Sequence, residues 1–173
     1  MAGSVSAEVD QPQNSNLNLE LDLQIALQPS EDAVLPAQAD VEQWVAAALE
    51  GQLEEAQLTI RLVGNDESAT LNSQYREKQG ATNVLSFPFE APADVPLPLL
   101  GDLIICAPLV TQEAQEQGKA ARAHWAHLVV HGVLHLRGHD HIDDVEAREM
   151  EDLERKIMAY LGFEDPYAGD DVA

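Results

Sequence analysis

Residues 128–141 read LVVHGVLHLRGHDH. The first nine are apolar or glycine apart from two histidines, so they predict a helix that is buried on almost every side. Gly138 follows, and a glycine at the end of a helix can adopt the positive φ angle that turns the chain back. We therefore expect a central helix over residues 119–138, followed by a tight return.

Strands and helices alternate upstream of this helix, and one further helix follows it. The leucines of LNLELDLQIAL (17–27) recur every second residue, which is typical of a strand with one buried face. Asp40 is a candidate N-cap, and Pro88 favours an edge position for its strand. The pattern predicts strands at 17–27, 57–64, 83–89 and 102–107, helices at 40–50, 65–76, 108–118 and 144–162, and a loop at 90–101. The fold class is therefore α/β (α+β), with a mixed, roughly four-stranded sheet packed on the buried central helix and surrounded by other helices.

Length and composition favour one domain. The chain has 173 residues, 45% of them hydrophobic, which suffices for a core without disulfides. We expect a disordered N-terminal tail at 1–16, a single catalytic metallohydrolase domain at 17–163 and an acidic C-terminal tail at 164–173. No apolar run is long enough to span a membrane, and the start lacks the features of a secretory signal. With a single cysteine, Cys106, the chain is expected to be cytoplasmic.

The charge is strongly negative. There are 31 acidic and 9 basic residues, a formal net charge of −22. Such a charge argues against broad, non-specific binding of nucleic acid, because phosphates are repelled. An anionic substrate would therefore need a local basic patch.

All six histidines lie between residues 124 and 141. On an ideal helix the first four fall within an arc of roughly 80°. His131 and His135 are one turn apart, and the turn at Gly138 can bring His141 to the same point. Three imidazoles with one open position are typical of a catalytic zinc site, although nickel, cobalt and copper also suit nitrogen ligands.

Three neighbouring side chains are candidates for supporting roles. His124 and His127 lie upstream on the same helix face, where they are expected to support the ligands or line the cleft. Asp140 lies in the return loop and can orient a ligand histidine by accepting its N–H; capping of the loop is the alternative.

The spacing H-x-x-x-H-x-x-G-x-x-H also occurs in a class of zinc proteases, with one difference. Those enzymes carry a glutamate directly after the first histidine, and it acts as the general base. Gly132 occupies that position here. A glycine cannot accept a proton, which argues against a protease.

Three stretches resemble one particular family. HLVVHGVLHLRGHDH resembles the H-G-x-L-H-L-x-G-x-D-H signature of the YbeY family of metal-dependent endoribonucleases. LNSQYREKQGATNVLSFPF and GDLIIC are similar to two further segments of that family. The resemblance runs from about residue 40 to 162. Ala81 stands where a proline is common and His139 where an aromatic residue is common.

The resemblance implies a set of site residues. It places one zinc ion per chain on His131, His135 and His141, and a catalytic arginine at Arg76. An arginine fork binds phosphate oxygens in pairs and keeps its charge in a cleft, so Arg76, with Lys78, would supply the local positive patch. Attack on phosphorus by water and attack by the neighbouring ribose 2′-hydroxyl both remain open.

The resemblance also implies a biological role. It predicts a zinc-dependent, single-strand-specific endoribonuclease that acts in maturation of the 16S rRNA 3′ end and in ribosome quality control. The implied partners are single-stranded ribosomal RNA, the small ribosomal subunit and its proteins, and a ribosome-associated GTPase, with the chain itself a monomer. Two alternatives remain: a ribosome-assembly factor with a mainly structural metal, which the acidic surface favours, and a metal-dependent hydrolase of peptides or small molecules.

Overall fold

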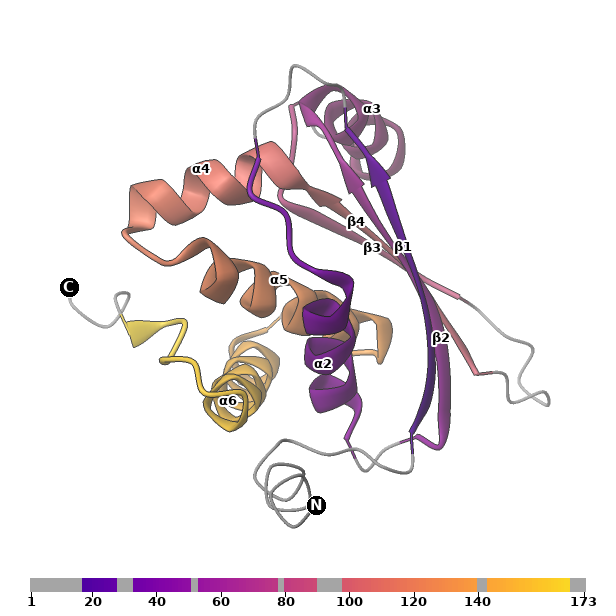
Figure 1. Ribbon diagram of the computed structural model, residues 1–173, viewed down its shortest axis with the longest axis vertical. Coiled ribbons are helices and arrows are strands. Elements are labelled where there is room, and N and C mark those ends of the chain that lie inside the picture. The colour runs from indigo at the N-terminus through magenta and orange to yellow at the C-terminus, as the bar shows by residue number, and fades with distance from the viewer. Residues whose placement is uncertain are drawn as a thin grey trace, which may run out of the picture.

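A four-stranded mixed sheet forms one layer of the molecule (Figure 1). The computed structural model describes residues 17–27, 33–50, 53–77, 80–89, 98–139 and 143–168. Within them the chain runs through β1 (Asn18–Ala26), α2 (Gln38–Leu49), β2 (Glu55–Val63), α3 (Asn65–Arg76), β3 (Val84–Pro88), β4 (Leu99–Cys106), α4 (Ala107–Gln117), α5 (Ala121–Leu136) and α6 (Asp144–Tyr160). This mixed α/β arrangement of four strands and five helices confirms the predicted fold class.

The strand order is β1-β2-β4-β3. β1, β2 and β4 are parallel, and β3 pairs antiparallel with β4 at the edge of the sheet. The edge position of β3 was predicted from Pro88, which ends this strand and cannot donate a backbone hydrogen bond. This strand is important below because it lines a cleft that also contains His131 and His135.

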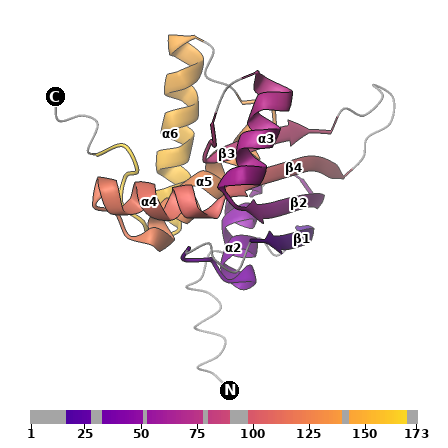
Figure 2. The same ribbon diagram turned by 90° about the horizontal axis from the view of Figure 1, so that it is seen from above.

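Helix α5 is the central helix, as the sequence predicted. Ten of its 16 residues are buried, including nearly all of its apolar side chains. It contacts β3 and β4 and is covered by α2, α4 and α6, and Figure 2 shows it between the sheet and α6. The helix ends at Leu136, two residues before the predicted end, and Gly138 follows with the predicted positive φ, 95°.

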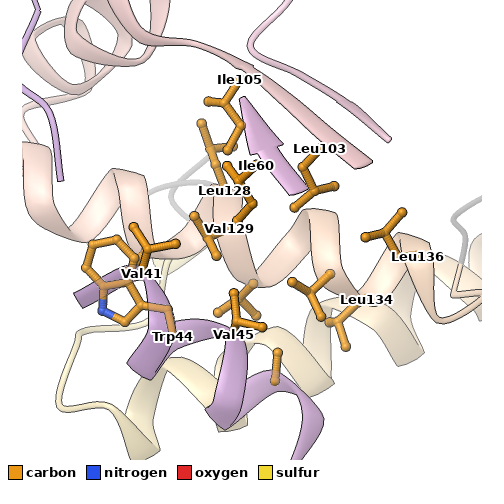
Figure 3. Close-up of a cluster of buried hydrophobic side chains, with 14 of the residues drawn as sticks. Val41, Trp44, Val45, Ile60, Leu103, Ile105, Leu128, Val129, Leu134 and Leu136 are labelled. Carbon is orange, nitrogen blue, oxygen red and sulfur yellow. The ribbon is translucent and has the colours of Figure 1, made fainter. Parts of the chain in front are cut away.

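The core lies between α5, α2 and the sheet (Figure 3). Val41, Trp44 and Val45 of α2 meet Leu128, Val129 and Leu134 of α5, and Ile60, Leu103 and Ile105 close the cluster from β2 and β4. All of these side chains are at most 5% exposed. Because the core holds α5 from several sides, the face of α5 that carries the histidines is fixed relative to β3.

Several predicted boundaries differ from the structure by one to three residues, and the starts of α2 and β4 have a physical explanation. Helix α2 begins at Gln38 with Ala37 as N-cap, so Asp40 lies in the first turn, where a carboxylate interacts favourably with the helix dipole. β4 begins at Leu99, inside the predicted loop 90–101, because Leu99 pairs with Gln57 of β2. The prolines nearby concealed that pairing. Within the part of the chain that the structure describes, no helix combines the length and apolarity that crossing a membrane requires.

Candidate metal centre and catalytic cleft

His131 and His135 bring two imidazoles together at one point. They lie one turn apart on α5, and their Nε2 atoms are 3.1 Å apart. Two nitrogens bound to one zinc ion at about 2.0–2.1 Å in tetrahedral geometry lie ~3.3 Å apart. The pair therefore has a spacing that fits two ligands of one ion, and a cation between the rings would relieve the contact of two ring nitrogens.

Glu154 of α6 sets the orientation of His131. The carboxylate is completely buried, and its Oε2 lies 2.9 Å from Nδ1 of His131. A carboxylate accepts a hydrogen bond, so Nδ1 carries the proton and Nε2 is the nitrogen suited to a metal. The other oxygen, Oε1, lies 2.5 Å from Nε2 of His127 and accepts a hydrogen bond of 2.5 Å from the Tyr167 hydroxyl.

The electrostatics keep Glu154 ionised. Burial alone would raise the pKa of this carboxyl, but the hydrogen bonds from His127 and His131 outweigh burial and hold the pKa at about 2, below its usual 4.5. Burial, with the hydrogen bond to Glu154, raises the pKa of Tyr167, so the phenol stays protonated and donates. Residues 164–168, which the sequence places in the acidic tail, thus include a donor to the site.

His127, His131 and Glu154 also form a group that could hold a metal, with donor atoms within 4.8 Å of one another. Two observations favour the nitrogen pair of His131 and His135 instead. The separations of 2.5 and 2.9 Å between Glu154 and the two rings are hydrogen-bond lengths. Glu154 is also fully buried, so an ion bound there would have little access to a substrate.

His124 makes a separate pair with Glu113 of α4. Its Nε2 lies 2.9 Å from Oε1 of Glu113, and the Asn83 amide also donates to this carboxylate. Burial acts to raise the pKa of Glu113, but the hydrogen bonds from His124 and Asn83 prevail and lower it. Among the residues that the structure describes, the buried Nδ1 of His124 has no hydrogen-bond partner. His124 and His127 line a pocket beside this region, and the Nε2 atom of each meets a carboxylate.

A cleft of about 570 Å³ joins the histidine pair to Arg76. It is lined by the end of α3, by the β3 strand with the residues before it, and by His131 and His135 of α5. The guanidinium of Arg76 is exposed and makes no hydrogen bond or ion pair with the residues that the structure describes. Arg61 and Arg122, by contrast, are paired with Glu67 and Asp40. Arg76 is thus a cation available to an anionic ligand.

Two buried polar side chains hold α3 beside β3. Ser68 exchanges hydrogen bonds with the backbone of Thr82 at 2.9 and 3.0 Å, and Asn72 donates to the carbonyl of Gly80 at 2.9 Å. Helix α3 ends at Arg76, followed by Glu77 in a left-handed conformation with a φ of 55°. These contacts place Arg76 at the mouth of the cleft.

Gly132 does not face the cleft. A Cβ atom at this position would lie 2.8 Å from a methyl carbon of Leu103, which is fully buried in the sheet. The position taken by glutamate in the zinc proteases therefore points into the core in this protein. The absence of a base at residue 132 follows from how α5 packs on β4.

The structure brings together some of the predicted site residues. His131, His135 and Arg76 line one cleft, and His124, His127 and His131 line an adjoining pocket. His141, Asp140 and Lys78 lie outside the described residues. Glu154 and Tyr167 were not predicted, although Glu154 had a detectable signal: it lies between Met150 and Met158, each one turn away on the buried face of α6.

In this α/β fold, a histidine pair lines one cleft together with an arginine that has no ion-pair partner among the described residues. Metal-binding nitrogens and a phosphate-binding cation in one cleft suit a metal-dependent hydrolase of anionic substrates. A family model described as endoribonuclease YbeY matches residues 25–162. The chain is also 60% identical over 142 residues to the endoribonuclease YbeY of Stenotrophomonas maltophilia, covering 80% of this chain and 88% of that one. The chain belongs to the YbeY family of endoribonucleases, which are hydrolases that act on RNA.

The fold is also similar to that of a Thermotoga maritima protein solved in solution. The TM-score is 0.55 and the identity 24%, over 80% of this chain and 88% of that one. At this identity the similarity supports the fold alone, and the family assignment depends on the sequence matches.

Proposed function

We propose that this chain is a zinc-dependent, single-strand-specific endoribonuclease that matures ribosomal RNA at the 16S 3′ end and acts in ribosome quality control. Residues 17–163 form the catalytic domain, with one zinc ion held by His131, His135 and His141. The observation that carries the proposal is that His131, His135 and Arg76 line the same cleft. That cleft combines metal-binding nitrogens with a phosphate-binding cation.

Each residue has a defined task in this proposal. A bound zinc ion supplies Lewis acidity, lowering the pKa of a coordinated water and polarising a phosphoryl oxygen. Arg76 binds the non-bridging oxygens of the scissile phosphate and stabilises the charge that develops there. Glu154 keeps the proton on Nδ1 of His131, so that Nε2 stays directed at the ion.

The nucleophile is either water or the neighbouring ribose 2′-hydroxyl. Gly132 occupies the sequence position of the protease base, and it faces Leu103. The products distinguish the two routes, because attack by the 2′-hydroxyl leaves a 2′,3′-cyclic phosphate. Lys78 and Asp140 are assigned, as the resemblance implies, to phosphate binding and to orienting a ligand.

The acidic surface suits binding to a basic protein partner during this activity. With a net charge of −22, the chain would meet free RNA slowly, whereas it would be attracted to basic ribosomal proteins. We accordingly place the monomer in the cytoplasm on the small ribosomal subunit, with a ribosome-associated GTPase as a further partner. The same charge favours the second candidate, an assembly factor whose metal is mainly structural.

The test compares Arg76→Glu with Arg148→Glu, a matched change at an exposed arginine on α6 outside the cleft. Arg76→Glu should abolish cleavage of single-stranded RNA while the zinc content per chain stays unchanged, and Arg148→Glu should retain cleavage. Loss of zinc from Arg76→Glu would assign Arg76 a structural role. In cells that lack the protein, restoration of normal 16S 3′ ends by His131→Ala would favour the assembly factor.

A further inference from the structure

Tyr75 is an exposed aromatic residue at the mouth of the cleft. Its exposed fraction is 63%, and it lies on α3 next to Arg76. Its ring contacts that of Phe87 on β3 edge to face, with 5.1 Å between the ring centroids and an interplanar angle of 79°. Both rings line the cleft that contains His131 and His135. The contact with Phe87 steadies the ring, while most of its surface stays open to solvent.

The position of Tyr75 relative to Arg76 matches the chemistry of an RNA strand. Phosphates and bases alternate along the strand, so a cation that binds one phosphate lies close to a neighbouring base. Exposed aromatic rings beside cations are how proteins hold unpaired bases, because every base has a face that can stack. The cleft volume of about 570 Å³ suits a ligand the size of one or two nucleotides.

We propose that Tyr75 is a stacking platform for one unpaired nucleobase next to the phosphate bound by Arg76. The proposal deepens the proposed function and rests on it. A base within a duplex is covered by its neighbours on both faces and cannot stack on Tyr75, so the platform also provides a physical reason for preferring single-stranded RNA.

A purely structural role for Tyr75 makes a different prediction. The described contact of its ring is with Phe87, and a side chain this exposed contributes little to the core. Tyr75→Ala should therefore leave the melting temperature close to that of the wild type. Tyr160, which is 43% exposed and lies outside the cleft, offers a matched control as Tyr160→Ala.

The experiment is a double-mutant cycle that combines a change in the protein with a change in the RNA. The probe is a short unpaired RNA with a mapped cleavage site, used intact and as a series in which one nucleotide at a time is abasic. Binding to the zinc-loaded chain is followed by fluorescence anisotropy at low temperature, with gels to verify that the RNA is intact. Cleavage is measured separately as kcat and KM.

Tyr75→Ala should weaken binding of the intact RNA about 10- to 100-fold, mainly through KM, while Tyr75→Phe and Tyr160→Ala should stay within about 2-fold of the wild type. One abasic position beside the scissile phosphate should weaken wild-type binding by a similar factor and leave Tyr75→Ala almost unaffected. If Tyr75→Ala weakens binding by the same factor, relative to the wild type, for the intact RNA and for every abasic RNA, then Tyr75 does not stack on a base and the proposal is wrong. If the wild-type chain binds RNA without cutting it, the proposed function is wrong. The binding measurements would still show whether Tyr75 stacks on a base.

Discussion

Two of the histidine–glutamate pairs along α5, His124–Glu113 and His131–Glu154, use opposite ring nitrogens. His124 directs Nε2 to Glu113, and its buried Nδ1 has no hydrogen-bond partner in the described part of the chain. His131 directs Nδ1 to Glu154, and its Nε2 meets Nε2 of His135. The residue types and the N···O distances of 2.9 Å are the same in both pairs. The difference lies in which nitrogen the carboxylate contacts.

That difference decides which histidine can serve a metal in the cleft. When a carboxylate contacts Nε2, the remaining nitrogen is Nδ1, which lies close to the backbone and is buried in His124 and His127 alike. When the carboxylate contacts Nδ1, the outer nitrogen stays available at the tip of the ring. The contact of a carboxylate with Nδ1 thus distinguishes His131 from His124 and His127, whose Nε2 atoms meet carboxylates.

Removal of a ligand should have the largest effect. His131→Ala should weaken zinc binding by more than about 100-fold, beyond the effect typical of supporting residues. His124→Ala should leave the zinc affinity within a few-fold of the wild type, because neither of its ring nitrogens is directed at the histidine pair. Competition with a chromophoric chelator measures both. If both variants lose zinc affinity to the same extent, His131 and His124 do not differ in their relation to the metal.

Introducing a glutamate at the position of the protease base should destabilise the fold and should not produce a protease. Gly132→Glu places a carboxylate against Leu103 in the core and should lower the free energy of unfolding by more than about 3 kcal/mol. Gly132→Ala should cost about 1 kcal/mol, since overpacking is partly offset by a better helix propensity. Urea unfolding measures both variants. A stable Gly132→Glu protein that cleaves peptides would show that residue 132 faces the cleft.

The carboxylates of the two pairs provide the next comparison. Glu154→Gln should weaken zinc binding about 10- to 100-fold, because a neutral amide no longer secures the proton on Nδ1 of His131. Glu113→Gln should change zinc affinity little, because it contacts His124. The same chelator competition separates them. Similar zinc affinities for both variants would mean that Glu154 does not position the ligand.

The smallest effect is a pH dependence in the metal-free protein. The folded-state pKa of Glu154 is about 2 against the ordinary 4.5, so its stabilisation is fully present above about pH 4.5 and is lost as the pH falls toward 2. The difference in unfolding free energy between the wild type and Glu154→Gln should therefore shrink over that interval. Urea unfolding at several pH values measures it. A difference that stays constant from pH 5 to pH 2 would contradict the low pKa.

The helical site features could be predicted because they are local. His131 and His135 share a face by the geometry of a single helix, and Gly138 has the positive φ that the sequence indicates, just after that helix ends. Arg76 came from the family resemblance, and the structure places it in the same cleft. These features depend on residues close in sequence or on a motif already known.

The supporting network could not be predicted because it depends on packing between distant segments. Glu154 lies 23 residues after His131, among many acidic residues on α6, and only its position on the buried face distinguishes it. Tyr167 reaches the site because the segment after α6 turns back, with Asp165 paired to Arg155 and the carbonyl of Pro166 bonded to Lys119. No periodicity in the sequence indicates that return.

A crystal structure of the zinc-loaded chain tests the central claim most directly. The account predicts zinc within about 2.0–2.1 Å of Nε2 of both His131 and His135, with Glu154 still hydrogen-bonded to Nδ1 of His131. Zinc bound by Glu154 and His127, with His135 turned away from the ion, would contradict it.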